Sequence, residues 1–463
     1  MKSRPELPAG PWLVVGLARS GIAAARALLA REERVIGLDA GSPQAARALA
    51  GEGVELHLDE PDGGALLDGV GAVIKSPGVP AQAPAVKAAR EREIPVLGEL
   101  ELAWRLLSNE FLAVTGTNGK TTTVELIGHI HRKAGLPVAV AGNVGTAVSS
   151  LMGTLAPDAT VVCEASSFQL EDTLAFAPEA AVLLNLTPDH LDRHGTLAAY
   201  AVAKLEAFAR QDAMDVAVLP QDVAERLAWA GAPGVPGAAR RVSFGWDNAQ
   251  AALYELDGEL WWQGTPLISL SEMRLRGRHN VENAMAAAAV CLARGIEPYA
   301  VRAGLASFRG VAHRLEEVAE IAGVLLVNDS KATNVASTLV ALEAFAGRPL
   351  HLILGGQGKG QDFSILREPI AAACAGVYLI GQDTPAIAAA LANVPLPVLE
   401  CGELERALPA ALDAARAEAP DGAGRAPDSP VVLLSPACAS FDQFTDFEAR
   451  GERFRELVEK LQG

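Results

Sequence analysis

The stretch that decides the fold reads Gly116-Thr117-Asn118-Gly119-Lys120-Thr121-Thr122. It lies between an apolar run, residues 111–114, and a helical pattern over residues 121–133. A strand, a glycine turn and a helix in this order bring backbone N–H groups close to phosphate oxygens, because the two glycines permit a tight turn. The N-terminus of the following helix favours negative charge. The sequence therefore predicts a phosphate-binding loop here.

The spacing of this loop, G-x-x-G-K-T, is shorter than the usual G-x-x-x-x-G-K-[ST] pattern. Lys120 can still reach the terminal phosphates of a nucleotide, and Thr121 can ligate Mg²⁺. A plain glycine turn is the alternative, but such a turn does not need a lysine beside two hydroxyl groups. We therefore predict that residues 116–122 bind the phosphates of a nucleotide.

The composition of the whole chain argues against several classes of protein. The formal net charge of −17 argues against non-specific binding to nucleic acid or to anionic membranes. No apolar run approaches the roughly 18 residues of a transmembrane helix. The five cysteines are widely spaced and never form C-x-x-C, which favours a reducing cytosol without a disulfide framework or structural zinc. We expect a cytoplasmic protein with no nucleic-acid partner and no membrane insertion.

Short apolar runs alternate with Ala/Leu-rich helical stretches along all 463 residues, which is typical of βαβ units on parallel sheets. The alternation restarts twice, and the length also suits about three domains. We predict an α/β protein with a Rossmann-like N-terminal domain (1–98), a central P-loop ATPase-like parallel-sheet domain (99–310) and a Rossmann-like C-terminal domain (311–463). The expected strands include 12–16, 34–38, 72–75, 111–114, 160–163, 181–184, 324–327, 351–354, 376–380 and 431–434.

Two polar segments follow strands of the central domain. Glu164 comes directly after the strand 160–163, and ligands in open α/β sheets sit beyond the carboxyl ends of strands. Glu164 is therefore expected to point towards the phosphate loop and hold Mg²⁺. A solvated glutamate at a strand end is the alternative.

The next strand runs into residues 185–194, where Asp189, His190, Asp192 and His194 suggest a metal or acid/base site. A turn that is polar merely because it is a turn is the alternative. The two histidines are four residues apart and could suggest zinc, but no third ligand set is apparent.

Lys204 lies on a predicted helix, residues 199–210, in one stripe with Tyr200 and Phe208. A half-buried lysine can have its pKa depressed, which leaves a reactive neutral amine. The local sequence favours the alternative, in which the side chain runs along apolar surface with its ammonium group in water.

These residues resemble the muramyl ligases of bacterial cell-wall synthesis. The motifs that carry the resemblance in the central region are 116–122, Gly142-Asn143-Val144-Gly145, Glu164-Ala165-Ser166-Ser167, Asp189-His190 and Arg278-His279-Asn280-Val281-Glu282-Asn283, followed by His313-Arg314. Three C-terminal motifs are similar to the D-glutamate-adding members: Asn328-Asp329-Ser330-Lys331-Ala332-Thr333-Asn334, residues 355–363 and residues 435–444. The resemblance runs from about Gly16 to Phe447.

The resemblance implies a reaction in which ATP phosphorylates the carboxylate of UDP-N-acetylmuramoyl-L-alanine. The amine of D-glutamate then attacks the acyl phosphate, and a tetrahedral intermediate expels phosphate. It also implies two Mg²⁺ sites: Thr121 and Glu164 hold the first, and His190 and Lys204 serve the second. The matching lysine of the family is carboxylated by CO₂, which requires a neutral amine. The resemblance therefore favours a buried, reactive Lys204 amine over an ammonium group in water.

The resemblance further assigns substrate and nucleotide contacts. Asn280 and Asn283 would lie on the adenine side, and Arg314 and Asp329 would close over the nucleotide. The D-glutamate site would comprise Lys331, Thr333, Lys359, Ser440, Phe441 and Phe447. Lysines suit a substrate with two carboxylates, because hydrogen bonds to charged groups contribute about 1.5–3 kcal/mol each.

The first domain invites a dinucleotide-binding interpretation, because residues 16–21 follow a strand and Asp39 ends the next one. However, Ala18 replaces the middle glycine that lets backbone approach a pyrophosphate. The resemblance instead implies that UDP binds here, near Arg19, Ser20, Asp39, Ser76 and Gly78, with Asn143 towards the muramoyl group.

Three other functions remain as alternatives. A folylpolyglutamate synthase would share the central motifs but not the C-terminal ones. A dinucleotide-dependent dehydrogenase would conflict with Ala18 and with the Lys120 loop. A non-catalytic nucleotide-binding protein would leave Glu164, His190 and Lys204 without a role. We expect the ligase to act as a monomer.

Overall fold

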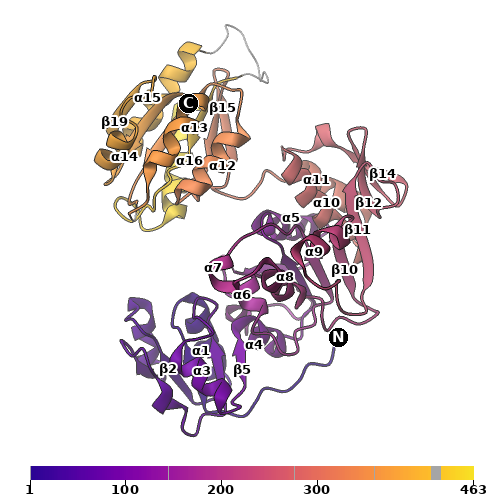
Figure 1. The fold of residues 1–463 in the computed structure, drawn as a ribbon. Coiled ribbons are helices and arrows are strands. Elements are labelled where there is room, and N and C mark those ends of the chain that lie inside the picture. Colours follow the sequence, from indigo (N-terminus) through magenta and orange to yellow (C-terminus); the bar gives the residue numbers. More distant parts are fainter. Residues whose placement is uncertain (1, 144, 276, 359, 419–428, 463) are drawn as a thin grey trace. The chain divides into compact units, whose positions relative to one another are not determined.

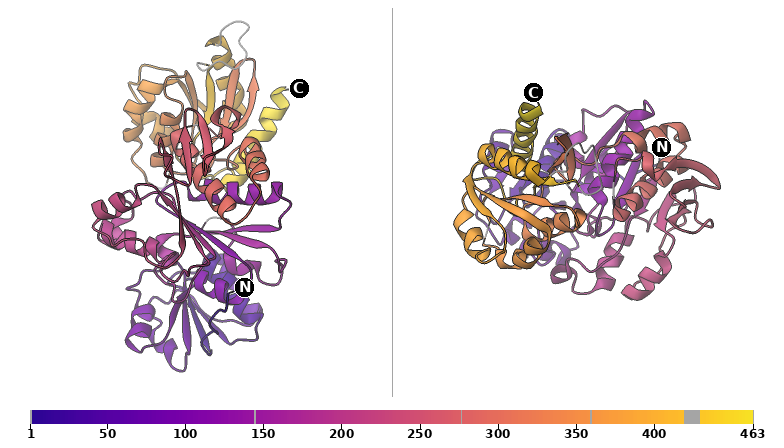
Figure 2. Two further views of the ribbon diagram at one scale, coloured as in Figure 1. Left: turned by 90° about the vertical axis from the view of Figure 1, so that its right-hand side faces the viewer. Right: turned by 90° about the horizontal axis from the view of Figure 1, so that it is seen from above.

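Three sheets organise the computed structural model, which describes residues 2–143, 145–275, 277–358, 360–418 and 429–462 (Figure 1). The chain divides into two units, Met1–Phe308 and Arg309–Gly463. The first unit contains two of the sheets, and the second unit contains the third. Helices lie against the strands of each sheet (Figure 2). The predicted α/β architecture with three sheets is confirmed.

The first sheet is parallel throughout and has the order β3-β2-β1-β4-β5. Its strands are β1 Trp12–Val15, β2 Val35–Leu38, β3 Glu55–His57, β4 Ala72–Lys75 and β5 Val96–Gly98. Alternate residues of β1 enter two different cores: Trp12 and Val14 pack with helix α1 (Arg19–Leu29), and Leu13 and Val15 pack with helix α3 (Pro84–Glu91). A strand buried on both faces reads as an unbroken apolar run, which explains why the sequence indicated it.

The second sheet places the phosphate loop at its centre. Strand β6 (Phe111–Thr115) lies between β8 (Thr160–Glu164) and β9 (Ala180–Leu183), and all three are parallel. The chain crosses from β8 on one side of β6 to β9 on the other, and such a switch point is where α/β sheets bind ligands. The remaining strands are β7 Val138–Gly142, β10 Val216–Pro220, β11 Arg240–Trp246, β12 Leu253–Leu256, β13 Glu259–Trp262 and β14 Thr265–Ser269.

Beyond β11 the second sheet departs from the parallel sheet predicted for the central domain. Strands β12, β13 and β14 form an antiparallel meander. Two-residue turns join them, Asp257-Gly258 and Gln263-Gly264, and all four of these residues have positive φ. Positive φ at both central positions matches the twist of a tight hairpin.

The helices of the first unit connect and cover these strands. They are α2 Ala48–Gly51, α4 Glu99–Leu106, α5 Lys120–Lys133, α6 Ser167–Leu170, α7 Leu191–His194, α8 Leu197–Leu205, α9 Val223–Ala230, α10 Arg278–Ala293 and α11 Pro298–Ser307, besides α1 and α3. Short 3₁₀ helices are η1 Gln44–Arg47, η2 Gly64–Leu67, η3 Val148–Leu151 and η4 Leu270–Glu272.

The third sheet has the order β15-β16-β20-β17-β18-β19, parallel except for the antiparallel pair β15–β16. Its strands are β15 Glu316–Ile321, β16 Val324–Asn328, β17 Leu350–Gly355, β18 Cys374–Ile380, β19 Val398–Gly402 and β20 Val431–Leu434. Its helices are α12 Val335–Ala344, η5 Phe363–Leu366, α13 Arg367–Ala373, α14 Thr384–Ala390, α15 Leu404–Glu418 and α16 Phe447–Gln462. The three C-terminal motifs follow the adjacent strands β16, β20 and β17, so the sheet brings them to one edge.

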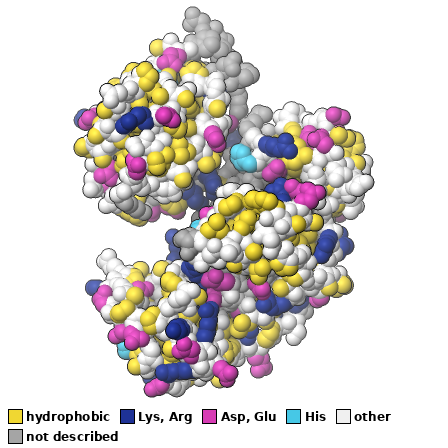
Figure 3. All heavy atoms as spheres, in the orientation of Figure 1, with side chains coloured by type: hydrophobic (Ala, Val, Ile, Leu, Met, Phe, Trp, Pro, Cys, Tyr) yellow, Lys and Arg dark blue, Asp and Glu magenta, His cyan; other side chains and the backbone are white. Residues whose placement is uncertain are grey.

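Within the described part of the chain, no helix has both the length and the apolar character needed to cross a bilayer. On the face that Figure 3 shows, acidic and basic side chains are interspersed with apolar ones.

Candidate active site

The side chain of Lys120 folds back onto the backbone of the phosphate loop. Lys120 Nζ donates hydrogen bonds to Gly116 O at 2.9 Å and to Thr117 O at 2.8 Å. Gly116 has φ 148° and Gly119 has φ 85°, so both glycines adopt conformations that other residues rarely take. A Cβ atom at Gly119 would lie 2.1 Å from the side-chain oxygen of Asn283 on α10, which shows how closely that helix approaches the loop.

Asn185, two residues beyond the end of β9, holds the first half of the loop. Its side-chain oxygen accepts hydrogen bonds from the backbone N–H of Thr117 at 3.1 Å and of Asn118 at 2.9 Å, and its amide donates to Asn118 O at 3.1 Å. Thr187 N donates to the Thr117 hydroxyl. Asn185 is not among the site residues predicted from the sequence. Its place as the first polar residue after an apolar run was the signal that could have found it.

Thr121 and Glu164 meet as predicted. The Thr121 hydroxyl donates to Glu164 Oε2 at 2.7 Å, and the Asn143 amide donates to Glu164 Oε1 at 3.1 Å. Glu164 is buried at the end of β8, the neighbour of β6 in the sheet. Two oxygen atoms so close together beside a phosphate loop form the ligand chemistry that Mg²⁺ prefers.

Lys204 is buried on α8 with only 2% of its surface exposed. Its Nζ donates to Gly116 O at 2.7 Å and lies 4.3 Å from the centre of the Tyr200 ring. Burial, reinforced by the charge of Lys120, lowers the pKa of the Lys204 ammonium to about 7, and Asp189 and Glu164 oppose this only in part. The alternative with the ammonium in water is therefore wrong.

His190 stands at the start of α7 with φ 51°, an uncommon conformation for a residue other than glycine. Its ring packs 4.8 Å from the ring of Phe168 and 6.4 Å from that of Tyr200, which also contacts Lys204. Nearly half of the His190 side chain is exposed. A ligand can therefore reach it.

His194 differs from His190, because it stacks on Phe168 and its Nε2 lies 3.0 Å from the Ser167 hydroxyl. The described residues contain no group of three or more His, Cys, Asp or Glu side chains arranged to hold a metal ion. Among these described residues, His190 and His194 therefore lack the further His, Cys, Asp or Glu ligands that a zinc site would need.

The predicted UDP residues of the first sheet lie at the carboxyl ends of β1, β2 and β4. The Asp39 carboxylate accepts from Leu17 N at 2.6 Å and from Gly41 N at 2.8 Å, and the Ser76 hydroxyl donates to Gly16 O at 2.6 Å. These bonds tie the three strand ends together. Of the others, Arg19 donates to Gly145 O at 2.8 Å, Ser20 is half-buried and Gly78 is exposed.

In the second unit, Asp329 follows β16 and is 5% exposed. Its carboxylate accepts from Leu315 N at 3.1 Å and from the Ser435 hydroxyl at 2.8 Å. Burial raises the pKa of Asp329 to about 7, and these bonds and the neighbouring Arg314 lower it only in part. Arg314 itself is exposed.

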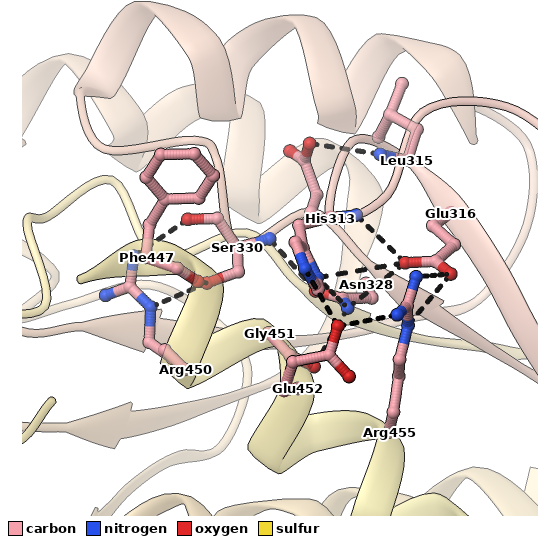
Figure 4. A network of polar contacts seen from close by, with 11 residues as sticks. His313, Leu315, Glu316, Asn328, Ser330, Phe447, Arg450, Gly451, Glu452 and Arg455 are labelled. Carbon is pink, nitrogen blue, oxygen red and sulfur yellow. Dashed lines mark hydrogen bonds and ion pairs between the residues drawn. The ribbon is translucent and has the colours of Figure 1, made fainter. Parts of the chain in front are cut away.

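A network of polar contacts joins the start of this unit to β16 and α16 (Figure 4). The Asn328 amide lies 2.9 Å from His313 Nδ1 and donates to Gly451 O at 3.1 Å. The Ser330 hydroxyl donates to Phe447 O at 2.8 Å and accepts from Arg450 Nε at 2.9 Å. The network fixes the residues on either side of Asp329 against the helix that begins at Phe447.

The predicted D-glutamate residues come together only in part among the described residues. Lys331 Nζ lies 5.9 Å from the centre of the Phe447 ring, and Lys331 N donates to His313 O at 3.0 Å. Thr333 N donates to Lys331 O at 2.9 Å. On the neighbouring loop, Ser440 is buried whereas Phe441 is 63% exposed. Lys359 lies outside the described residues.

The buried Asp329 carboxyl predicts a pH effect on stability. Its pKa is raised in the folded protein, so its contribution is fully present below the unfolded value near 4 and is lost as pH rises through about 7. Asp329→Asn mimics the neutral acid. We expect the variant to match the wild type at pH 4 and to melt about 3–8 °C higher at pH 8. Thermal unfolding of both proteins from pH 4 to 8 checks this, and melting curves that stay parallel would contradict it.

Three domain families match the chain in sequence order. "Mur ligase MurD-like, N-terminal domain" matches residues 11–98, "Mur ligase middle domain" matches residues 114–291, and "Mur ligase, glutamate ligase domain" matches residues 313–438. Each matched range falls on the strands of one of the three sheets.

Curated relatives match over nearly their whole length. The "UDP-N-acetylmuramoylalanine--D-glutamate ligase" of Pelotomaculum thermopropionicum is 40% identical, covering 97% of this chain and 97% of the relative. The protein of the same name from Anaeromyxobacter dehalogenans is 43% identical, covering 98% of each. A crystal structure of UDP-N-acetylmuramate-alanine ligase from Thermotoga maritima superposes with a TM-score of 0.57 at 18% identity, over 98% of this chain and 100% of that one. At that identity the likeness shows a shared fold alone.

Proposed function

The chain belongs to the Mur ligase family, and from this membership we propose that it is the ATP-dependent ligase that adds D-glutamate to UDP-N-acetylmuramoyl-L-alanine in peptidoglycan precursor synthesis. The observation that carries the proposal is the match, at about 40% identity and over nearly full length, to relatives that bear this activity in their names. The buried Lys204 beside the phosphate loop, whose pKa is lowered to about 7, supports it independently.

A carboxylate is a poor acyl donor, so the proposed reaction begins with its activation. The carboxylate of the UDP-substrate attacks the γ-phosphorus of ATP, which gives an acyl phosphate and ADP. The neutral amine of D-glutamate then attacks the acyl carbon, and the tetrahedral intermediate collapses with loss of phosphate and a proton. Phosphoryl transfer between anions needs positioning and charge neutralisation above all. Lys120, folded over the loop at Gly116, can supply a positive charge to the β- and γ-phosphates.

We propose that Thr121 and Glu164 bind the first Mg²⁺. Their two oxygen atoms are 2.7 Å apart and lie beside the loop. When bound, Mg²⁺ neutralises charge on the phosphate oxygens. Asn143, which donates to the other Glu164 oxygen, orients the carboxylate, and we propose that it also contacts the muramoyl group. The rest of the loop, Gly116, Thr117, Asn118, Gly119 and Thr122, contributes backbone donors, and Asn280 and Asn283 on α10 contact the adenine side.

We propose that CO₂ carboxylates Lys204. The neutral amine attacks the carbon of CO₂ and releases a proton, which yields a carbamate with two oxygen atoms. With a pKa of about 7, roughly half of the Lys204 amines are neutral at neutral pH. The carbamate and His190 would then serve the second Mg²⁺, since an unmodified amine is a poor ligand for a hard cation.

The remaining substrate contacts are proposed from the family pattern. The D-glutamate carboxylates would bind around Lys331, Thr333, Lys359 and Ser440, with Phe441 and Phe447 at the rim; Arg314 and Asp329 would contact the nucleotide. UDP would bind at Arg19, Ser20, Asp39, Ser76 and Gly78.

We propose domain limits at 1–98, 99–310 and 311–463, and we propose that the enzyme is a monomer. We also propose a cytoplasmic location, which suits the free thiols of all five cysteines.

Phosphate release from ATP tests the proposed function. The reaction contains UDP-N-acetylmuramoyl-L-alanine and one amino acid from a panel that includes both enantiomers of glutamate. We expect release above background only with D-glutamate and only when the UDP-substrate is present. Equal rates with L-glutamate, or release that needs no UDP-substrate, would overturn the assignment.

A further inference from the structure

Arg193, on the short helix α7, holds a loop of the first sheet. One guanidinium nitrogen donates to Pro77 O at 2.8 Å. The other donates to Val79 O at 3.2 Å and to the Glu171 carboxylate at 2.7 Å. Pro77 and Val79 belong to the loop that follows β4, whereas Glu171 follows α6 beside the second sheet. A single side chain therefore joins segments from two sheets of the first unit.

The same guanidinium also contacts the surroundings of His190. It lies 4.1 Å from the centre of the Phe168 ring, and the His190 ring packs on that ring at 4.8 Å. The backbone N–H of Arg193 donates to His190 O at 3.1 Å. A shift of Arg193 would therefore move both the turn that carries His190 and the ring against which His190 packs.

A buried charge cluster anchors the strand end of this loop. Lys75, the last residue of β4, is fully buried and its Nζ lies 2.5 Å from the Asp172 carboxylate and 3.5 Å from that of Glu171. Arg90 also reaches Asp172 at 3.2 Å. Lys75 fixes the start of the loop and Arg193 fixes its middle, and the Glu171 carboxylate contacts both side chains.

We propose that Arg193 is a positioning residue that holds the loop of residues 76–79 at a fixed position relative to His190. This inference rests on the proposed function, because Ser76 and Gly78 are proposed UDP-substrate residues and His190 is proposed to serve the metal. The guanidinium suits this role, since its planar fork of donors can bind two carbonyls and a carboxylate at once, which an ammonium group cannot do in the same geometry. A misplacement of about 1 Å between bound substrate and reacting groups can lower a rate about 100-fold.

The test compares Arg193→Gln and Arg193→Lys with a matched control, Arg226→Gln. Arg226 also binds a carboxylate, Asp222 at 2.6 Å, but on the surface of α9. For both Arg193 variants we expect kcat/KM for the UDP-substrate to fall about 10–100-fold, while KM for ATP stays within about twofold. Hydrogen exchange at Gly78 and Val79 should quicken in these variants, while exchange in the phosphate loop stays unchanged. The control should match the wild type in every measurement.

Two results would overturn the inference. One is wild-type kinetics and unchanged exchange in Arg193→Gln. The other is a parallel loss in the constants for ATP and for the UDP-substrate, together with faster exchange throughout the unit, which is the signature of a purely structural contact. An inactive wild type would refute the proposed function instead. The exchange comparison would then still decide whether Arg193 holds the loop.

Discussion

Replacing Lys204 with methionine is expected to lower the rate of D-glutamate-dependent phosphate release by about 1,000-fold or more, in line with the loss of a group that stabilises developing charge. Methionine preserves the buried apolar stem but removes the amine that donates to Gly116 O at 2.7 Å. Without that nitrogen no carbamate forms, and the proposed second metal site loses its anionic ligand. The control is Lys133→Met, because Lys133 is exposed at the end of α5. Its rate should stay within about twofold of the wild type, as is usual for surface substitutions.

Steady-state rates at saturating substrates distinguish a loss of chemistry from a loss of folding when they are paired with melting temperatures. We expect Lys204→Met to melt no lower than the wild type, since it removes a buried group that is costly to charge. A variant that keeps more than about a tenth of the wild-type rate would refute a role for Lys204 in the reaction.

The carbamate itself should depend on pH. Because burial lowers the pKa of Lys204 to about 7, about a tenth of the amines are neutral at pH 6 and about nine tenths at pH 8. At a fixed concentration of dissolved CO₂, the fraction of chains that carry the added mass of one CO₂ should rise across this range. Native mass spectrometry of the wild type and of Lys204→Met provides the measurement. A wild-type chain without the added mass at pH 8 in bicarbonate would count against carboxylation.

The pairing of Thr121 with Glu164 could be predicted from the sequence for a simple physical reason. Both residues follow apolar runs long enough to be buried strands, and parallel strands present their carboxyl ends at one edge of a sheet. The prediction needed only the positions of the strands along the chain and their parallel direction, and it did not depend on how side chains pack. The three C-terminal motifs follow the neighbouring strands β16, β20 and β17, so the same argument places them at one edge of the third sheet.

Arg193 and Asn185 could not be assigned roles in this way. Arg193 binds a carbonyl 116 residues away, and Asn185 binds N–H groups 67 and 68 residues away. Each contact depends on the shape of an irregular loop, and backbone acceptors and donors leave no mark in the sequence. Lys204 lies between these cases. Its stripe with Tyr200 indicated partial burial, but only the fold shows that the ammonium meets Gly116 O and the charge of Lys120.

Gly119→Ala is expected to weaken binding of ADP or ATP by about 100-fold or more, equivalent to about 3 kcal/mol. Alanine at φ 85° costs about 1–2 kcal/mol for the left-handed conformation alone. The added Cβ would also stand 2.1 Å from Asn283 Oδ1 and 2.9 Å from its Cγ. Because Asn283 is 4% exposed on α10, its side chain has little space to retreat. Either the loop or the proposed adenine contact must therefore move.

The matched control is Gly135→Ala, two residues beyond the end of α5. Gly135 has φ 71°, so alanine there bears the same conformational cost, but no other atom lies within 4 Å of the added Cβ. Titration calorimetry with Mg²⁺ and ADP should give the wild-type Kd for Gly135→Ala and a greatly weakened one for Gly119→Ala. Both variants should lose a similar amount of stability from backbone strain, so the difference in Kd isolates the contact with Asn283. Equal Kd values in the two variants would mean that nucleotide binding does not depend on the close approach of α10 to the loop.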